Sequence, residues 1–527
     1  MRFVSAVLLS LSPLAHAAVF TVDTTSDALL SACTPAPADC SLRGALSAAN
    51  ATPEFDEIRF QIPASDSGFQ PTTQHWRITV GSVALPAISA AVLIDGYTQP
   101  GASANTRTPM QGGLDAVLTI ELVPGSVAGS QQNGLDTFGN DFAAAASTIR
   151  GLVISRFGSQ IQLGGSAAHR IEGCFLGTDI RGTQAAVSTP GGRGNGIRVQ
   201  GPGPYRIGGS QPAERNLLSG LSTAINQFAA SDGLRIQGNL IGTDRSGTLA
   251  LGNTQDALSL QQGVLRNAQI GGTDPLMRNV IAASSFSAIS LFASATGALL
   301  GTQIEGNYIG TDVGGTQPLG NGGNPGSPSQ PQPTISVLGN VDCGLLIGGN
   351  AAGQANLIAN SAAQGLRNDT CRGVVAADNH YVGNRGVAFD NVAGGGMIGP
   401  TPNDAGDPDD GGNRLQNFPE LQISAIQPNG DVQLSYRVDT ALTNAAYPLE
   451  LRFYRAGRGG GGVARITQVS YSTPGVPLTL TLTAPALPLT AVSVDAAGNQ
   501  SEFAPALGDF IAANGFEAPV ALLAQRR

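Results

Sequence analysis

The sequence predicts an all-β protein built mainly as a parallel β-helix, a solenoid in which short strands of successive coils stack on one another. Two observations predict it: a motif that recurs with a nearly constant period, and short apolar runs that end in glycine or asparagine. Self-similarity at a fixed period is typical of repeat architectures, in which no unit is stable without its neighbours.

The recurring motif is GNLIGTDRSGTLALGN at residues 238–253, with related segments at 173–184 and 306–321. Its Gly-Thr-Asp triplets end at Asp179, Asp244 and Asp312, and are therefore 65 and 68 residues apart. An Ile-Gly-Gly marker follows a similar period and begins at Ile207, Ile270 and Ile347. Because one coil of a β-helix usually takes about 22 residues, we expect three coils in each repeat.

The apolar runs between these markers indicate strands. They are short, alternate partly between apolar and polar side chains, and begin about 20 to 26 residues apart between positions 149 and 234. Gly and Asn at their ends tolerate the left-handed backbone angles that a sharp corner needs. At about 22 residues per coil, the roughly 290 residues of coils that end near Pro400 allow about 13 coils, or fewer once insertions such as the Gly- and Pro-rich segment 322–333 are removed.

These motifs carry a resemblance to a known family. The patterns GN-x-IGTD-x-x-GT and IGG…RN[LV]I, together with CSLRGALSAAN at residues 40–50, resemble bacterial secreted right-handed parallel β-helix proteins with a CSLREA-type N-terminal motif. The resemblance implies a right-handed, pectin-lyase-like solenoid over residues 91–400. It implies no particular activity, since the family includes surface proteins with no assigned chemistry.

Residues 18–90 are predicted to form an N-terminal cap. Positions 42, 45, 46 and 49 are apolar at helical spacing, and Ser41 is suited to cap the helix N-terminus. The family has Glu where this chain has Gly44, so the reciprocal capping bond is lost and the helix is weakened by up to about 1 kcal/mol. The open end of a solenoid exposes core and strand edge, which such a helix would cover.

Composition and the N-terminus indicate an exported protein. Residues 1–17 have the charged start, apolar centre and Ala-His-Ala cleavage site of a signal peptide. No later apolar run is long enough to span a bilayer. The net charge of −9, with no lysine in the chain, disfavours a nucleic-acid partner. Together with the tail at 507–527, which resembles tails of some exported proteins, these features place the protein outside, or on the outer surface of, a Gram-negative bacterium.

Export permits disulfides, and the chain has five cysteines. Cys33 and Cys40 are predicted to pair, and stacking of coils would bring Cys343 and Cys371 together. Cys174 lies in an apolar run and is expected to be a buried small hydrophobe.

After the solenoid, residues 401–420 form an acidic linker, and residues 421–506 alternate short strands with turns, a pattern typical of an antiparallel β-sandwich. The linker clusters hard oxygen donors that would suit calcium, with two glycines that bend the chain. The candidate ligands are Asp404, Asp407, Asp409, Asp410 and Asn413. The alternative is a solvated acidic hinge.

One compact group could carry catalysis. A β-helix polysaccharide lyase needs a base, often arginine in that fold class, beside acidic calcium ligands. The residues that could supply both are Asp378, His380, Arg385 and Asp390. The alternative is a set of ordinary surface side chains near a corner of the solenoid.

Two further groups of residues are candidates for a functional role. The three Gly-Thr-Asp aspartates are interpreted as turn residues whose carboxylates accept bonds from amides two residues on. His75, Trp76 and Arg77 could form an exposed platform for a sugar.

We therefore expect a secreted or surface-exposed scaffold for adhesion or for binding a glycan or other extracellular polymer, not an enzyme. One alternative is a calcium-assisted polysaccharide lyase or hydrolase of the pectin-lyase-like class. The other is a structural spacer without activity.

Overall fold

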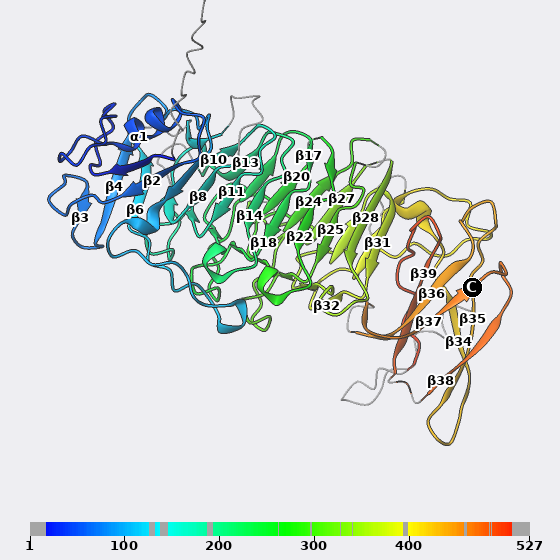
Figure 1. Ribbon diagram of the computed structural model, residues 1–527. Helices are drawn as coiled ribbons and strands as arrows, with labels where there is room; N and C mark the ends of the chain where they lie inside the picture. The colour runs from blue at the N-terminus through cyan, green and yellow to red at the C-terminus, as the bar shows by residue number, and fades with distance from the viewer. Residues whose placement is uncertain are drawn as a thin grey trace, which may run out of the picture.

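The computed structural model describes residues 17–508, except 126–131, 138–145, 187–192, 262, 296–297, 327, 340, 394–398, 458–460, 484 and 486. The predicted signal peptide and most of the predicted tail therefore fall outside the described residues. The described chain is all-β apart from one α-helix and short 3₁₀ turns, and long parallel sheets stack into a β-helix-like solenoid followed by a smaller antiparallel module (Figure 1).

Three sheets run along the solenoid, and we call them sheets I, II and III in the order in which each coil visits them. Sheet I is parallel wherever its pairing is given and has eleven strands. They are β1 (Val19–Val22), β2 (Asp56–Phe60), β5 (Val92–Asp95), β8 (Thr148–Arg150), β11 (Arg170–Glu172), β14 (Arg206–Gly208), β18 (Arg235–Gln237), β22 (Gln269–Gly271), β25 (Gln303–Glu305), β28 (Asp342–Gly348) and β31 (Arg372–Ala377).

Sheet II also has eleven strands, parallel except for the first pair. They are β3 (Phe69–Gln70), β4 (His75–Val80), β6 (Ile120–Pro124), β9 (Leu152–Ile154), β12 (Phe175–Leu176), β15 (Leu217–Leu218), β19 (Leu240–Ile241), β23 (Val280–Ile281), β26 (Tyr308–Ile309), β29 (Leu357–Ala359) and β32 (His380–Val382).

Sheet III has nine parallel strands. They are β7 (Asn133–Asp136), β10 (Ser159–Leu163), β13 (Asn195–Val199), β16 (Ile225–Gln227), β20 (Leu258–Leu260), β24 (Ile289–Phe292), β27 (Ile335–Leu338), β30 (Leu366–Asn368) and β33 (Phe389–Asn391). A minor parallel pair, β17 (Ser231–Asp232) and β21 (Leu265–Arg266), lies between strands of sheets III and I in chain order. The short 3₁₀ turns are η1 (Gly96–Thr98), η2 (Pro109–Gln111), η4 (Pro212–Glu214), η5 (Pro275–Met277) and η6 (Gly412–Leu415).

The core is one continuous column inside these sheets. The isoleucine of the Ile-Gly-Gly marker shows how it is built, because each marker residue pairs with an isoleucine of a neighbouring coil on sheet I and all are buried. The stack runs Ile94, Ile149, Ile171, Ile207, Ile236, Ile270, Ile304 and Ile347. Burial of each such side chain contributes roughly 1.5–3 kcal/mol, which no coil could gain alone.

The repeat holds two coils, so the prediction of three is wrong. Ile207 pairs with Ile236, and Ile236 pairs with Ile270, so two coils fill the distance between successive markers. The apolar runs that begin every 20 to 26 residues belong to different sheets: the run at 196 is in sheet III, and the run at 216 leads into sheet II. The spacing of these runs therefore reflects the distance between strands and not the length of a coil.

A ladder of buried asparagines forms the corner between sheets I and II. Each lies directly before a sheet II strand, and its Nδ2 donates to the Oδ1 of the asparagine in the next coil at 2.9–3.0 Å. The ladder comprises Asn216, Asn239, Asn279, Asn307, Asn356 and Asn379, all at most 2% exposed. The Asn of the recurring Arg-Asn and Gly-Asn pairs is therefore a hydrogen-bonding element that satisfies buried backbone groups as well as a turn residue.

Removal of one member is expected to destabilise the solenoid. Asn279 accepts from the backbone N of Asn239 at 3.0 Å and donates to the carbonyl of Ile236 at 2.7 Å, and both partners are shielded from water. Asn279→Ala should lower the free energy of unfolding by about 2–4 kcal/mol, measured by denaturant titration. Asn350→Ala, at an exposed loop position, is the matched control and should change little.

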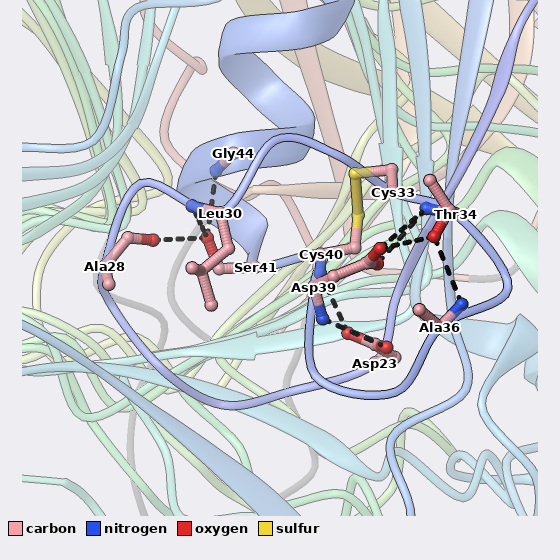
Figure 2. The surroundings of a disulfide bond; sticks show 10 residues. All are labelled: Asp23, Ala28, Leu30, Cys33, Thr34, Ala36, Asp39, Cys40, Ser41 and Gly44. Atoms are coloured by element: carbon pink, nitrogen blue, oxygen red, sulfur yellow. Dashed lines mark hydrogen bonds between the residues drawn. A yellow bond between two sulfur atoms is a disulfide. The ribbon is translucent and has the colours of Figure 1, made fainter.

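The N-terminal helix α1 (Leu42–Ala49) lies against β1 and β2 at one end of the solenoid (Figure 1). It buries Leu42 and Leu46 in the core column. Ser41 is its N-cap, as predicted, and its Oγ accepts from the backbone N of Gly44 at 3.0 Å (Figure 2). The departure from Glu at position 44 has a steric reason. A Cβ on Gly44 would lie 1.7 Å from the carbonyl oxygen of Leu30, so only glycine lets this loop pack on the helix.

Both predicted disulfides are present. Cys33–Cys40 closes the loop beside the cap (Figure 2), and Cys343–Cys371 joins two neighbouring coils at β28 and β31. Cys174 is fully buried, and its burial raises the pKa of the thiol to about 12, which makes it inert.

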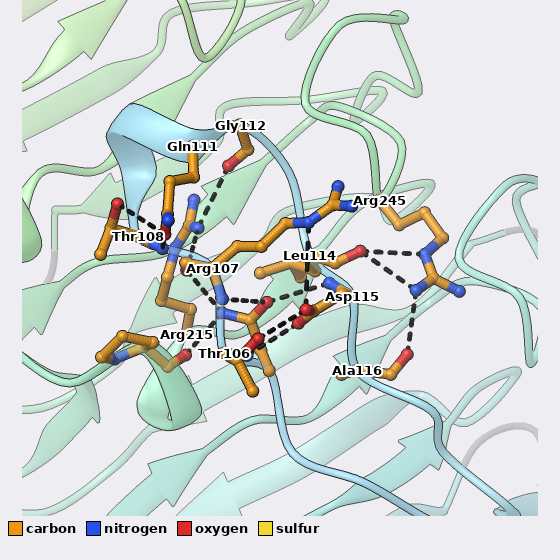
Figure 3. A network of polar contacts seen from close by, with 12 residues as sticks. Thr106, Arg107, Thr108, Gln111, Gly112, Leu114, Asp115, Ala116, Arg215 and Arg245 are labelled. Atoms are coloured by element: carbon orange, nitrogen blue, oxygen red, sulfur yellow. Dashed lines mark hydrogen bonds and ion pairs between the residues drawn. The ribbon is translucent and has the colours of Figure 1, made fainter.

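The outer face of sheet II is covered by the chain itself. Residues 102–118 cross it, and Leu114, Ala116 and Leu118 pack on outward-facing apolar side chains of that sheet. Two arginines from later coils hold this strap by donating to its carbonyls: Arg215 to Arg107 and Gly112, and Arg245 to Leu114 and Ala116 (Figure 3).

The C-terminal module consists of two antiparallel three-stranded sheets around one small core. The first sheet contains β34 (Glu420–Ile426), β35 (Val432–Arg437) and β38 (Leu478–Leu482), and the second contains β36 (Leu449–Ala456), β37 (Gly462–Tyr471) and β39 (Leu489–Val494). After β39, residues 499–502 bond to the last coil. Asn499 and Gln500 accept from backbone N–H groups of β31 at 3.0 and 3.1 Å, so the module covers an otherwise open strand edge.

Candidate metal centre

Three aspartates meet on the loop that leads from the solenoid into the C-terminal module. Asp404, Asp407 and Asp409 each present a carboxylate oxygen, and these three atoms lie within 4.8 Å of one another. The loop lies between β33 and η6, in the segment predicted to be an acidic linker. This places the candidate site at the junction of the two parts of the molecule.

The loop is held in shape by bonds from the module side. Asp407 Oδ2 accepts from Gln416 Nε2 at 2.9 Å, from the backbone N of Asn417 at 3.2 Å and from Thr440 Oγ1 at 2.9 Å. Asn417 Oδ1 accepts from the backbone N of Asp404 at 3.1 Å, and its Nδ2 donates to the carbonyl of Asp404 at 2.8 Å. One oxygen of Asp407 is therefore saturated, and the carboxyl group cannot turn away.

One carboxylate oxygen of each aspartate lacks a partner in the described part of the chain. The Oδ1 atoms of Asp404, Asp407 and Asp409 are shielded from solvent and have no hydrogen-bond partner among the described residues. Asp407 is only 4% exposed. Its burial, together with the neighbouring charges of Asp409 and Asp404, raises its pKa to about 7, and burial likewise raises the pKa of Asp409. An unsatisfied carboxylate in such a place is costly unless a cation meets it.

The donor set suits a hard divalent cation. All three groups are carboxylates with no sulfur or imidazole among them, a set that favours calcium or magnesium over zinc or copper. Calcium takes six to eight oxygens and tolerates irregular geometry, and it would leave further positions for carbonyls or water. The residues present therefore fit the ion that the sequence suggested.

Two predicted ligands are not part of this group, which corrects the predicted set. Asp410 forms an ion pair with Arg372 of β31 at 2.9 Å and its side chain is 65% exposed. Asn413 is fully buried, where its Oδ1 accepts from the backbone N of Val374 and its Nδ2 donates to the carbonyl of the same residue. Both tie the linker to the last coil of sheet I, a partner that linear clustering did not indicate.

The four residues predicted as a catalytic group do not share one cavity. Asp378 and His380 line a hollow of about 360 Å³ beside β37, where Asp378 lies 3.5 Å from Arg465. Arg385 lines a different hollow of about 460 Å³. Asp390 is fully buried on β33 and accepts from Gln364 at 2.8 Å. A lyase site made of all four is therefore not assembled by the fold.

The Gly-Thr-Asp aspartates make turn contacts, as predicted, with a different spacing. Asp179 Oδ1 accepts from the backbone N of residues 183 and 184 at 2.7 and 3.0 Å, and Asp312 Oδ1 accepts from residues 316 and 317 at 2.8 and 3.0 Å. The bonds reach amides four and five residues on, not two, and close a wider loop after each sheet II strand.

The predicted sugar platform is wrong. His75 is 2% exposed and lies 3.0 Å from Glu121, and Trp76 is 8% exposed, donates to the carbonyl of Pro63 and packs on Phe69. Both belong to β4, whose parallel pairing with β6 encloses them.

Comparison with known proteins gives little beyond this geometry. No protein-family model matches the chain, and no curated protein matches it. Among solved structures, ORF18 of Geobacillus virus E2 is similar at 13% identity and a TM-score of 0.27, with 85% of this chain and 77% of that chain covered. A TM-score of this size supports no conclusion on fold or function.

Within the described parts of the chain, no helix combines the length and the apolar character needed to cross a membrane.

Proposed function

We propose that this protein is an exported scaffold that binds a glycan or another polymer outside the cell, and that calcium at Asp404, Asp407 and Asp409 stiffens the junction between its solenoid and its C-terminal module. The observation that carries the calcium assignment is the set of three shielded carboxylate oxygens without partners. The proposal includes a right-handed, pectin-lyase-like solenoid and membership of the CSLREA-type family that the sequence resembles, with an adhesin-like role at the outer surface of a Gram-negative bacterium.

Several features support a scaffold outside the cell. The solenoid gives a long face on which identical strand spacing repeats about every 4.8 Å, and two disulfides suit an oxidising compartment. The cap at one end and residues 499–502 at the other cover the strand edges that would otherwise pair with other chains.

In this proposal the calcium ion has a structural task. Asp407 is bonded to Gln416, Asn417 and Thr440, so an ion held by the three aspartates would tie the linker to the first strands of the module. It would also supply the positive charge that these shielded carboxylates lack, which removes their mutual repulsion.

The lyase alternative has less support, since its four candidate residues are distributed over two hollows and a buried strand. A structural spacer remains the third proposal, and it differs from a binding scaffold only in having no ligand.

Affinity electrophoresis of the purified mature protein through gels that contain a panel of neutral and acidic polysaccharides tests the choice. A scaffold is expected to be retarded by at least one polymer and to release no unsaturated product, whose ultraviolet absorbance would rise with time. Such a rise, abolished by Arg385→Ala, would establish the lyase instead. If no polymer retards the protein, the structural spacer is the alternative that survives.

A further inference from the structure

The outer face of sheet III is hollowed where four successive coils pass. The hollow has a volume of about 640 Å³ and is lined by residues of β24, β27 and β30, and by Asp256 and Gln261, which flank β20. Inward-facing and outward-facing side chains alternate along each strand, and the inward set belongs to the core column. The residues between them therefore point into the hollow.

Small hydroxyl side chains occupy one row of this face, and two of them, Ser290 and Ser336, line the hollow. Ser259, Ser290 and Ser336 pair in register on consecutive strands, and the next residue in that row is Arg367. Ser290 and Ser336 are 4% and 9% exposed, and Ser290 Oγ accepts a hydrogen bond from Gln261 Nε2. Each hydroxyl can both donate and accept a hydrogen bond, so the floor is polar without being charged.

Aromatic and apolar side chains form one wall. Phe292 and Leu338 pair in register on β24 and β27, on the row beside the serines, and Phe292 is 40% exposed although it is a large apolar group. Phe286 adds a second half-buried ring. Gln332 and Pro333, at the end of the Gly- and Pro-rich insertion, raise the rim on β27.

An acidic side chain lies at each end of the hollow. Asp256 accepts from the backbone N of Ser287 at 3.0 Å, and burial raises its pKa to about 6. At the other end Arg367 pairs with Asp369 at 2.5 Å. The titratable lining thus contains one cation against two carboxyl groups, and its net charge at neutral pH is zero or negative.

We propose that this groove is the polymer site of the scaffold and that it takes a neutral glycan chain, an inference that rests on the proposed function. A floor of hydroxyls, two rings and a few directional polar groups is the kind of lining that fixes a small polar ligand. Apolar C–H faces of sugar rings pack on aromatic rings, while the ring hydroxyls can bond to serine, glutamine and carboxylate oxygens.

The charge of the groove lining favours a neutral glycan over an acidic one, and the strap over sheet II favours the outer face of sheet III as the binding face. An acidic polysaccharide would bring further negative charge to Asp256 and Asp369 in a protein whose net charge is already −9. The strap at residues 102–118 (Figure 3) covers apolar side chains on the outer face of sheet II, whereas the hollow on sheet III is lined by residues of four successive coils. A chain-like ligand can therefore lie across several coils.

Affinity electrophoresis and a glycan array with the full mature protein test the proposal. Phe292→Ala and Asp256→Asn should each weaken binding to neutral polysaccharides such as β-glucan, xylan or galactomannan by about tenfold. Phe55→Ala removes an equally exposed ring, at 47% exposure, outside the groove and should leave binding unchanged. Thermal midpoints of all three variants establish that each is folded, and gelatin serves as a peptide ligand.

Each result of these binding experiments either supports the proposal or overturns a stated part of it. Retardation by neutral polymers that both groove variants weaken supports the proposal. Equal binding by wild type and Phe292→Ala overturns the groove and leaves the scaffold function intact. Retardation by acidic polymers alone, or capture by gelatin that Phe292→Ala abolishes, overturns the ligand class. Absence of binding to every polysaccharide overturns both the groove and the polymer-binding function.

Discussion

Calcium is expected to stabilise the folded protein by about 3–4 kcal/mol when its concentration is 100 to 1,000 times the dissociation constant. The reason is that the folded chain brings carboxylate oxygens of Asp404, Asp407 and Asp409 within 4.8 Å of one another. The Oδ1 atom of each aspartate is also shielded and has no partner among the described residues. The unfolded chain has no such preformed cluster. Urea titrations in calcium chloride and in chelator measure the difference as a shift of the unfolding midpoint.

Asp407→Asn is the decisive variant for this prediction. Its amide keeps the size of the side chain and can retain contact with Thr440, while the charge that would meet the ion is gone. The variant should lose most of the calcium response. Asp342→Asn, at an exposed position on β28, is the matched control and should respond as the wild type does. A full calcium response in Asp407→Asn would show that the ion binds elsewhere.

The second large effect is a loss of stability as the pH rises, from a carboxyl pair buried at the same junction. Glu502 is 5% exposed and Asp390 is not exposed, and their side chains contact each other. Glu502 also accepts from the backbone N of Asn391 at 2.9 Å and of Thr401 at 2.7 Å. Burial is the main cause that raises the pKa of Glu502 to about 8 and also raises that of Asp390.

The sign follows from which state holds the proton. The folded chain keeps Glu502 protonated up to about pH 8, while in the unfolded chain it ionises near 4.5. Its contribution is therefore complete below pH 4.5 and is lost as the pH rises towards 8, by roughly 3–5 kcal/mol. In Glu502→Gln, which stays neutral, the stability should depend much less on pH over this range.

Urea titrations of wild type and Glu502→Gln at several pH values between 4.5 and 8.5 measure this effect. Saturating calcium should be present throughout, so that Asp407 stays ionised and does not add its own titration. Glu54→Gln is the matched control, at a half-buried position far from the junction in sequence, and should follow the wild-type curve. Parallel curves for wild type and Glu502→Gln would contradict the prediction.

The sequence predicted the helix cap, the aspartate loops and the core isoleucines well, because the contacts that form them depend on residues close along the chain or on strand alternation. Ser41 caps α1 because its side chain reaches an amide three residues on, and Asp179 closes its own loop. The isoleucine of each Ile-Gly-Gly marker lies in the core stack because strand alternation places it there. The predicted number of coils per repeat was wrong, because the loops between strands differ in length and periodicity alone does not show which strand stacks on which.

The candidate sites also divide into contacts between residues close in sequence, which were predicted, and contacts between distant residues, which were not. Three of the five predicted calcium ligands converge because they lie within six residues on one loop, whereas Asp410 and Asn413 bond to β31, nearly forty residues earlier in the chain. The groove left no sequence signal. Its serines at 290 and 336 are scattered among many others in the sequence, and only the register of sheet III aligns them.

By itself, the amino-acid sequence determined that this chain forms strands with tight asparagine and glycine corners, a helical cap, two disulfides and an acidic loop of calcium-binding composition, because each depends on neighbours along the chain or on one repeated spacing. The tertiary structure alone decided which coils stack, which aspartates are left without partners, which carboxyl groups share a buried contact and where a face is hollow. Those properties arise from residues dozens of positions apart, which come together only when every strand finds its register on the coil before it.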